Sequence, residues 1–378
     1  MATVSVIIPA YNQSHYLGAA IQSVLEQSYP DFEAIVVDDG STDDTPIVAR
    51  GFNDQRVRYI YQENRGLSGA RNTGIRNSVG TYITYLDSDD LFLKDKLSLL
   101  VGELERNKTA GFVAGQAIPI DENGKPVGKI FNSPPPDDLR MLLLRNPFHV
   151  GSVMVRRSWQ EKVGFFDESL RSYEDWDMWL RLALAGCEMV WVPQPVSLYR
   201  FHSAQMTRIG SQMTTATFTV LDKIYADPGL PESWKLLRSQ AYSHAYLRAA
   251  AQSYNAEDYV NAQSCLEKAV ELNPELLRND ASQLADMFVA WTDLPKTGDP
   301  LAFVERIYDH LPDCLEPLRR KQRSALGQTA IQSAFSAYRQ GDMDRTRHAV
   351  LRAFMYSPKW MLNQGAWSML LRSTINRF

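Results

Sequence analysis

Strand-like and helix-like patterns alternate from residue 4 to residue 86, and this alternation constrains the fold more than any other feature. Apolar runs that predict strands lie at residues 4–8, 33–37, 57–61 and 81–86, and runs that predict helices separate them. Strands that alternate with helices in this way form parallel sheets. The run Val4–Ile8 is apolar except for Ser5, which is typical of a strand buried on both faces.

The pattern changes twice further along the chain. From about Gly111 to His202, short strand candidates (112–117, 152–156, 189–192 and 196–201) surround a helix that begins near Tyr173. After about Met206 only helical patterns remain. A chain of 378 residues has room for two domains. The sequence therefore predicts an α/β domain over residues 1–210, with a mixed, mostly parallel sheet flanked by helices, followed by an all-α domain over residues 211–378.

Two stretches of the helical region resemble each other at an offset of 84 residues (for example 358 − 274). The matching positions are Ala250, Tyr254, Asp258, Ala269 and Pro274 in one stretch and Ala334, Tyr338, Asp342, Ala353 and Pro358 in the other. Each stretch has the pattern of a helix, a polar turn, a second helix and a closing Pro. This resembles the tetratricopeptide repeat family, whose units are helical hairpins of about 34 residues. Ordinary helical hairpins are the alternative.

Composition excludes several classes of protein. The net charge of −4 does not fit a general nucleic-acid binder, which needs a strong basic excess. Cys187, Cys265 and Cys314 are too far apart to suggest a disulfide framework or a metal pair, and they favour a reducing, cytoplasmic setting. No apolar run approaches the roughly 20 residues of a membrane span. The C-terminal WSMLLRSTINRF favours a docked helix, with peripheral contact to a membrane surface as the alternative.

Polar and acidic residues follow three of the predicted strands. The first strand leads into PAYN (residues 9–12), the second ends in Asp38 and Asp39, and the fourth is followed by DSDD (residues 87–90). Ligands of open parallel sheets bind beyond the carboxyl ends of the strands, so we expect these residues at one rim. The first turn lacks the Gly-x-Gly-x-x-Gly of a dinucleotide site. Tyr11 could instead flank a base, or be a partly buried ring at a helix start.

The DSDD segment has the composition of a site for a hard cation. Mg²⁺ and Mn²⁺ prefer oxygen ligands, commonly one or two carboxylates together with substrate phosphates. The spacing of Asp87 and Asp89 lets two carboxylates converge from one turn, whereas Asp90 is expected to cap the following helix. Arg71 could neutralise a phosphate, or be a surface arginine of a helix. Asp39 could accept a hydrogen bond from a base or ribose, or belong to a turn.

The segment SYEDWDMW predicts the first turn of an amphipathic helix with acids near its positive end. Trp176, Trp179 and Leu180 are expected to pack inward, which leaves Asp175 facing elsewhere. A carboxylate with a modestly raised pKa suits general base catalysis near neutral pH. Helix capping by Glu174 and Asp175 is the alternative.

Together these segments resemble family 2 glycosyltransferases with the GT-A fold. The resemblance rests on VSVIIPAYN, EAIVVDDGSTDDT, QENRGLSGARNTGI, GTYITYLDSDD, and VGFFDESLRSYEDWDMWLRLALAG followed by LYRFH, in the family's order and over about residues 2–205. It implies a GT-A type sheet, a nucleotide-sugar donor that is usually a UDP-sugar, and Mn²⁺ or Mg²⁺ as cofactor. The acceptor is expected to be a hydroxyl of a glycan or glycolipid, in polysaccharide or glycoconjugate biosynthesis.

The resemblance also implies roles for individual residues. Those expected near the nucleotide-sugar are Pro9, Ala10, Tyr11, Asp39, Arg71, Asp87, Ser88 and Asp89. Asp89 would be the chief metal ligand, with Asp87 and His202 beside it, and Asp175 would be the catalytic base. A satisfied surface histidine is the alternative for His202. Ser88 departs from the Asp-Ala-Asp triplet that is frequent in the family.

The resemblance implies an inverting reaction. No Gln-x-x-Arg-Trp signature of processive enzymes follows Asp175, so one sugar per event is expected.

The helical region would bind a protein partner, mediate self-association or complete the acceptor site. One alternative is a nucleotidyltransferase, which needs a Gly-rich phosphate loop that PAYNQS lacks. Another is a haloacid-dehalogenase-type phosphatase, whose Asp-x-Asp normally follows its first strand. A third is a degenerate transferase that serves as a helical scaffold.

Overall fold

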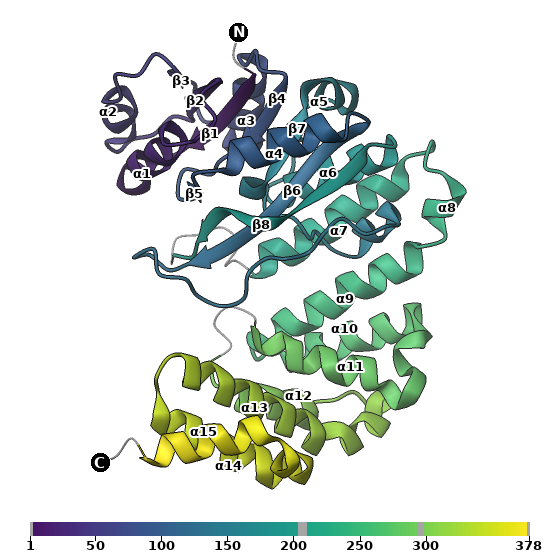
Figure 1. Ribbon diagram of the computed structural model, residues 1–378. Coiled ribbons are helices and arrows are strands. Elements are labelled where there is room, and N and C mark those ends of the chain that lie inside the picture. Colours follow the sequence, from purple (N-terminus) through teal and green to yellow (C-terminus); the bar gives the residue numbers. More distant parts are fainter. Residues whose placement is uncertain (1–2, 203–209, 294–297, 376–378) are drawn as a thin grey trace. The chain divides into compact units, whose positions relative to one another are not determined.

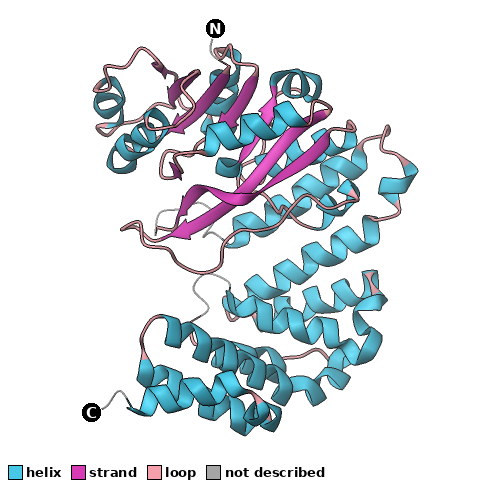
Figure 2. Cartoon of the chain, in the orientation of Figure 1, coloured by secondary structure: helices cyan, strands magenta, loops and turns pink. Residues whose placement is uncertain are grey.

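The computed structural model describes residues 3–202, 210–293 and 298–375, and the chain divides into two compact units, Met1–Leu237 and Arg238–Phe378. Every described strand belongs to the first unit, and the second is helical (Figure 2). The predicted order, an α/β part and then an all-α part, is confirmed. The predicted domain boundary near residue 210 stays a prediction. The compact units themselves divide after helix α8 (Glu232–Lys235).

One mixed sheet forms the framework of the first unit (Figure 1). Its strands are β1 (Val4–Ala10), β2 (Phe32–Asp38), β3 (Val57–Tyr61), β4 (Tyr82–Tyr85), β5 (Leu91–Phe92), β6 (Ala110–Ile120), β7 (Val153–Arg156) and β8 (Glu188–Arg200). Their order across the sheet is β3-β2-β1-β4-β7-β6-β8-β5. β1 to β4 are mutually parallel, as the alternating pattern predicts. β7 runs antiparallel to both of its neighbours, which makes the sheet mixed.

The central strands bring their carboxyl ends to a common edge. Every residue of β1 and β2 is buried, as their largely apolar patterns predict, and the buried polar side chains of Ser5 and Glu33 are joined by a hydrogen bond of 2.7 Å. The register pairs Ala10 with Asp38, so β1 and β2 end level, and it pairs Ile7 with Tyr85, so β4 ends three residues earlier at the same edge (10 − 7). The residues that follow these strands therefore gather at one rim of the sheet.

Helices cover both faces of this parallel half. The helices of the first unit are α1 (Ser14–Leu25), α2 (Thr45–Arg50), α3 (Gly66–Arg76), α4 (Lys96–Arg106), α5 (Arg157–Val163), α6 (Glu174–Leu184), α7 (Gly210–Ala226) and α8, with short 3₁₀ turns η1 (Leu139–Leu144) and η2 (Val150–Ser152). α1 and α4 pack with Val6 and Ile8 in the main core. α3 contributes Ala70 to a separate cluster with Ile35 and Val37, which lie on the other face of the sheet. Lys223 of α7 pairs with Asp177 of α6 over 2.7 Å.

β8 differs from its prediction. The sequence favoured two strands, because Pro193 and Pro195 interrupt the apolar runs. The structure has one strand, which pairs in parallel with β6 through register shifts between Gly115 and Ala117. The shifts lie where the prolines would break a regular ladder, since proline lacks the N–H that a ladder requires. The unbroken β8 delivers Arg200 and His202 to the rim.

The second unit consists of helices and short 3₁₀ turns within its described residues. They are α9 (Arg238–Asn255), α10 (Tyr259–Leu272), η4 (Pro274–Leu277), α11 (Arg278–Ala290), η5 (Trp291–Asp293), α12 (Pro300–Asp309), η6 (Asp313–Lys321), α13 (Gln322–Arg339), α14 (Met343–Tyr356), η7 (Pro358–Leu362) and α15 (Gln364–Ile375). α15 contains most of the C-terminal WSMLLRSTINRF segment, whose last three residues lie outside the described residues. None of the helices described here has the length and apolar character needed to cross a membrane.

The two stretches that resemble each other form equivalent hairpins, α9–α10 and α13–α14. Asp258 caps α10 by accepting the Asn261 N–H over 3.2 Å, and Asp342 caps α14 by accepting the Arg345 N–H over 2.9 Å. Each hairpin ends in a 3₁₀ turn that starts at the matching proline. The repeated sequence therefore has a repeated structure, while membership of the tetratricopeptide family stays a prediction.

Candidate active site

The turn after β4 places acidic side chains at the carboxyl edge of the sheet. The Asp90 N–H donates to the Asp87 carbonyl over 3.0 Å and closes the turn. The Leu86 N–H donates to the Ile7 carbonyl over 2.9 Å, which fixes the turn beside β1. Ser88 is buried beneath, whereas the side chains of Asp87 and Asp89 stay 27% and 15% exposed. Both carboxylates expected to meet a ligand are therefore accessible from solvent.

The end of β8 brings His202 to this turn. His202 Nε2 lies 2.8 Å from Asp89 Oδ2, and the His202 ring packs against the ring of Tyr16 with centroids 5.2 Å apart. Arg200 Nε donates to the Asp89 carbonyl over 2.8 Å, which fastens the strand end to the turn. His202 is buried, so it is not a surface histidine. Two donor side chains far apart in sequence thus meet at the rim.

Asp90 does not cap the following helix, and that prediction is wrong. The N-cap residue of α4 is Asp95, and strand β5 lies between Asp90 and the helix. Asp90 is fully buried. Its Oδ1 accepts the Arg200 N–H over 2.8 Å, and its Oδ2 lies 3.0 Å from His149 Nε2. Asp90 therefore holds β8 and the segment around His149 behind the turn.

Asp39 is bound by the loop that leads into α3. Its Oδ1 accepts hydrogen bonds from the Arg65 N–H (2.8 Å) and the Gln62 side-chain amide (2.6 Å), and its Oδ2 accepts one from the Gly66 N–H (2.8 Å). A carboxylate at a helix N-terminus is favoured by the free N–H groups there. Tyr11, at the neighbouring end of β1, is 49% exposed, whereas Pro9 and Ala10 are buried. The rim beside Asp39 thus presents an accessible aromatic ring.

Arg71 joins the turn after β4 to the start of α6. It is 1% exposed, so it is not a surface arginine. Its Nη2 donates to Asp87 Oδ1 over 2.6 Å and its Nη1 to Glu174 Oε1 over 2.5 Å. α3 lies close enough to bury Arg71 because Gly74, three residues on, has no Cβ to collide with Ile7. Burial alone lowers the pKa of Arg71, but the charges of Asp87 and Glu174 outweigh it and raise that pKa.

Replacing Arg71 with methionine should lower the free energy of unfolding by about 3–5 kcal/mol, because Glu174 then becomes an uncompensated buried carboxylate. Urea unfolding followed by circular dichroism measures the loss. The double variant Arg71→Met/Glu174→Gln removes both charges and should recover part of the stability. A loss below about 1 kcal/mol in Arg71→Met, the range of an exposed ion pair, would contradict the bridging role.

The start of α6 places Asp175 next to this bridge. Tyr173 adopts a left-handed backbone conformation with φ 59°, which turns the chain into the helix. This conformation is uncommon for a bulky residue, and such residues cluster at functional sites. Trp176 and Trp179 are buried, as predicted, and Asp175 is half-buried. Glu174 binds Arg71 rather than capping the helix.

Asp175 is held in place by two hydrogen bonds. Its Oδ2 accepts from Asn146 Nδ2 over 3.0 Å, and its Oδ1 accepts from the Trp176 N–H over 2.7 Å. Burial, with the charge of Glu174, raises the pKa of Asp175 to about 7, against the opposing effects of Arg71 and Asn146. A positioned carboxylate that titrates near neutral pH can accept a proton from a hydroxyl group.

The rim fits a divalent cation that is coordinated partly by the protein and partly by the phosphates of a bound substrate. Across the described residues, no group of three or more His, Cys, Asp and Glu side chains could hold a metal on its own. Asp89 and His202 offer two donor atoms 2.8 Å apart, and the Asp87 carboxylate is occupied by Arg71. Mg²⁺ is usually bound by one or two carboxylates, with phosphate oxygens and water completing its shell. The side chains at this rim would likewise supply only part of a coordination shell.

Sequence comparison identifies the family. Residues 5–164 match the family described as Glycosyl transferase family 2. The putative teichuronic acid biosynthesis glycosyltransferase TuaG of Bacillus subtilis is 30% identical over 200 residues, which cover 52% of this chain and 78% of TuaG. The chain belongs to glycosyltransferase family 2. An uncharacterized glycosyltransferase of Rickettsia felis is 37% identical over 190 residues, or 48% of this chain, but the match spans only 30% of that relative's length.

Solved structures support the fold of this family 2 chain. TarS 1–349 of S. aureus, in complex with UDP-GlcNAc, superposes with a TM-score of 0.52 and 16% identity, covering 94% of this chain and 91% of TarS 1–349. The mannosyltransferase PcManGT of Pyrobaculum calidifontis, in complex with GDP-Man and Mn²⁺, superposes with a TM-score of 0.53 and 20% identity, covering 85% of this chain and 86% of PcManGT. The expected GT-A-like arrangement of sheet and helices is thus confirmed.

Sequence reasoning missed two residues of the family 2 site. For Glu174 the sequence suggests only a helix cap, as an alternative shared with Asp175, whereas Glu174 is the second partner of Arg71. Asn146 was not singled out, although it binds Asp175. An acid next to a proposed base is a visible signal for Glu174. Asn146 precedes Asp175 by 29 residues and belongs to no sequence motif that would predict its contact with Asp175.

Proposed function

We propose that this chain is an inverting, metal-dependent glycosyltransferase that moves a sugar from a nucleotide-sugar, preferentially a UDP-sugar, to a hydroxyl of a glycan or glycolipid. The observation that carries the proposal is the Arg71 bridge, which links the acidic turn at Asp87 to the start of α6 next to Asp175. A donor site and a base must lie close together for such a transfer. The nucleotide-sugars bound by TarS and PcManGT support the donor class.

The rim divides into a nucleotide end and a diphosphate end. Pro9, Ala10 and Tyr11 border the base, with the exposed ring of Tyr11 as a surface for stacking. Asp39 orders the loop before α3 and keeps lone pairs for a hydrogen bond from the base. Asp87 and Ser88 would lie toward the ribose. The phosphates would lie beyond them, toward the pair of Asp89 and His202.

Mn²⁺ or Mg²⁺ would be held by Asp89, with His202 and Asp87 beside it. When bound, the cation would neutralise charge that develops on the leaving diphosphate. The Mn²⁺ in the PcManGT complex supports a metal of this kind. The carbonyl of Asp89 is fixed by Arg200, which limits the directions in which its carboxylate can turn.

Asp175 is the proposed general base. In its ionised form it takes the proton of the acceptor hydroxyl through an oxygen that also accepts a protein hydrogen bond. The acceptor oxygen forms a bond to the anomeric carbon while the bond to the diphosphate oxygen breaks on the opposite face, which inverts the configuration. The nucleoside diphosphate leaves with the electron pair. Asn146 and the Trp176 N–H keep the carboxylate oriented through this step.

The helical region would serve in acceptor binding, in contact with a protein partner or in self-association. A scaffold that has lost catalysis is the second candidate, because such a surface of helical hairpins suits macromolecular partners. The arrangement of Asp89, His202 and Asp175 favours the enzyme. A role in polysaccharide or glycoconjugate biosynthesis would agree with the teichuronic acid assignment of TuaG.

A donor screen tests the proposal. With Mn²⁺ present, slow hydrolysis of one nucleotide-sugar among UDP-, GDP- and TDP-sugars should release its nucleoside diphosphate, and a UDP-sugar is expected. Product release is measured by chromatography, with EDTA as the matched control. Hydrolysis of none of them, together with no binding of UDP or GDP, would favour the scaffold.

A further inference from the structure

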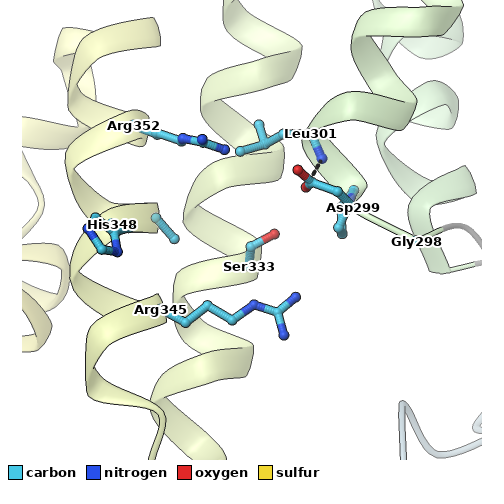
Figure 3. Close-up of a pocket in the computed structure, with 9 residues that line it drawn as sticks. Gly298, Asp299, Leu301, Ser333, Arg345, His348 and Arg352 are labelled. Atoms are coloured by element: carbon cyan, nitrogen blue, oxygen red, sulfur yellow. Dashed lines mark hydrogen bonds between the residues drawn. The ribbon is translucent and has the colours of Figure 1, made fainter.

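A pocket in the helical unit collects positively charged side chains that the proposed catalytic site does not use. It lies among α12, α13 and α14 and has a volume of about 360 Å³, within the usual range of small-molecule sites (Figure 3). Arg345, His348 and Arg352 line it from α14, and Ser333 lines it from α13. The residues Gly298–Leu301 at the beginning of α12 complete the wall.

The three α14 residues share one face of the helix. Their spacing of three and then four residues places them one above another along the axis. Figure 3 shows the side chains of Arg345 and Arg352 extending across α13 toward the beginning of α12, with Ser333 between them. The pocket therefore presents two guanidinium groups and one hydroxyl to the same space.

Neither guanidinium group has a hydrogen-bond or ion-pair partner among the described residues. The contrast with neighbouring arginines is clear, since Arg347 pairs with Asp344 over 3.0 Å and Arg319 pairs with Glu316. The acid in the pocket is Asp299, whose Oδ1 accepts the Leu301 N–H over 3.0 Å as the N-cap of α12. One capping carboxylate against two arginines leaves the pocket with a positive excess.

The charge of the surrounding sequence has the same sign. Residues 298–378, which include every residue that lines the pocket, contain twelve Lys and Arg against seven Asp and Glu, a difference of +5, although the whole chain carries −4. A basic surface on an acidic protein attracts anions to this part of the chain in particular.

The geometry points to a phosphate-bearing ligand, and we propose that this pocket binds one through Arg345, Arg352 and Ser333. Each guanidinium group can donate two parallel hydrogen bonds to an oxyanion. A carboxylate has two oxygens, whereas a terminal phosphate has three acceptor oxygens, which suits two arginines and a hydroxyl better. The volume exceeds that of a phosphate alone, which leaves room for an organic part of the ligand. A soluble phosphate monoester and the phosphomonoester headgroup of phosphatidic acid share this chemistry.

Binding measurements test the site on the full chain. Isothermal titration with glycerol 3-phosphate, at an ionic strength matched with chloride, examines the soluble source. Flotation with phosphatidylcholine vesicles, with and without phosphatidic acid, whose headgroup is a terminal phosphate, examines the lipid source. The test variant is Arg345→Gln/Arg352→Gln. The charge-matched control is Arg320→Gln/Arg339→Gln, two exposed arginines of the same unit that do not line the pocket.

The expected result is binding by the wild type and the control, and binding weaker by roughly tenfold or more in the test variant, since charge-assisted pairs are lost. Binding of glycerol 3-phosphate identifies a soluble ligand, and binding of only the vesicles that contain phosphatidic acid identifies a headgroup. Equal loss in both double variants would show general attraction by the basic surface and would overturn the site. So would the absence of binding in both assays. Thermal unfolding at equal temperatures in both variants confirms that the fold is intact.

Discussion

Asp175→Asn is expected to lower kcat for sugar transfer by roughly 10²–10⁴-fold, the usual contribution of a positioned general base. Asparagine keeps the size of the side chain and cannot accept the acceptor proton. Donor binding should change little, because Asp175 acts on the acceptor hydroxyl and not on the nucleotide. The measurement is initial-rate kinetics with the donor found in the screen, combined with titration of the nucleoside diphosphate. Near-full transfer by Asp175→Asn would show that the base is another group.

The pH dependence of the transfer rate of the wild type is a second test of Asp175 as the general base. Only ionised Asp175 accepts a proton, and burial raises its pKa to about 7. The rate should therefore be constant well above pH 7 and fall as the pH decreases through about 7. Asn146→Ala removes a hydrogen bond that favours the ionised form, so the fall should begin at a higher pH. The control variant Asp137→Asn neutralises an exposed carboxylate away from Asp175 and should keep the wild-type dependence of the rate on pH.

The parallel half of the fold was predictable because its signals are local. β1 and β2 are buried on both faces, and a largely apolar run follows directly from that environment. β8 was not predictable in the same way. Its prolines resemble strand ends, and only the irregular partner strand β6 allows one strand to pass through them. Local pattern identifies a strand, but its partner decides whether the strand continues.

The candidate site was predictable to the extent that strand ends determine it. Asp89 follows β4, and the parallel register placed it at the rim. The burial of Arg71 is not visible in the sequence, because it depends on Gly74 of α3 packing directly against Ile7 of β1. The role of Asp90 was misjudged for a related reason. Its partners, Arg200 and His149, lie far away in sequence, so the local sequence indicates only the nearby helix.

Asp89→Asn is expected to abolish the metal dependence of donor binding. In the wild type, Mn²⁺ should tighten the binding of UDP relative to EDTA, because the cation would join Asp89 to the diphosphate. Loss of residues that only support a metal ligand typically costs 10–100-fold in affinity or activity, so loss of the chief ligand should cost about 100-fold or more. Titration calorimetry with UDP, with Mn²⁺ and with EDTA, measures this difference.

Two further variants separate a metal role from a structural one. Asp95→Asn removes an exposed carboxylate near the same turn, at the start of α4, and should retain the full effect of Mn²⁺. His202→Gln distinguishes a ligand from an orienting residue. If His202 binds the cation, its loss should approach that of Asp89→Asn. If it only positions Asp89 through their 2.8 Å contact, UDP binding should weaken but stay dependent on Mn²⁺. Binding of UDP that is tight and equal with Mn²⁺ and EDTA in the wild type would refute the metal site itself.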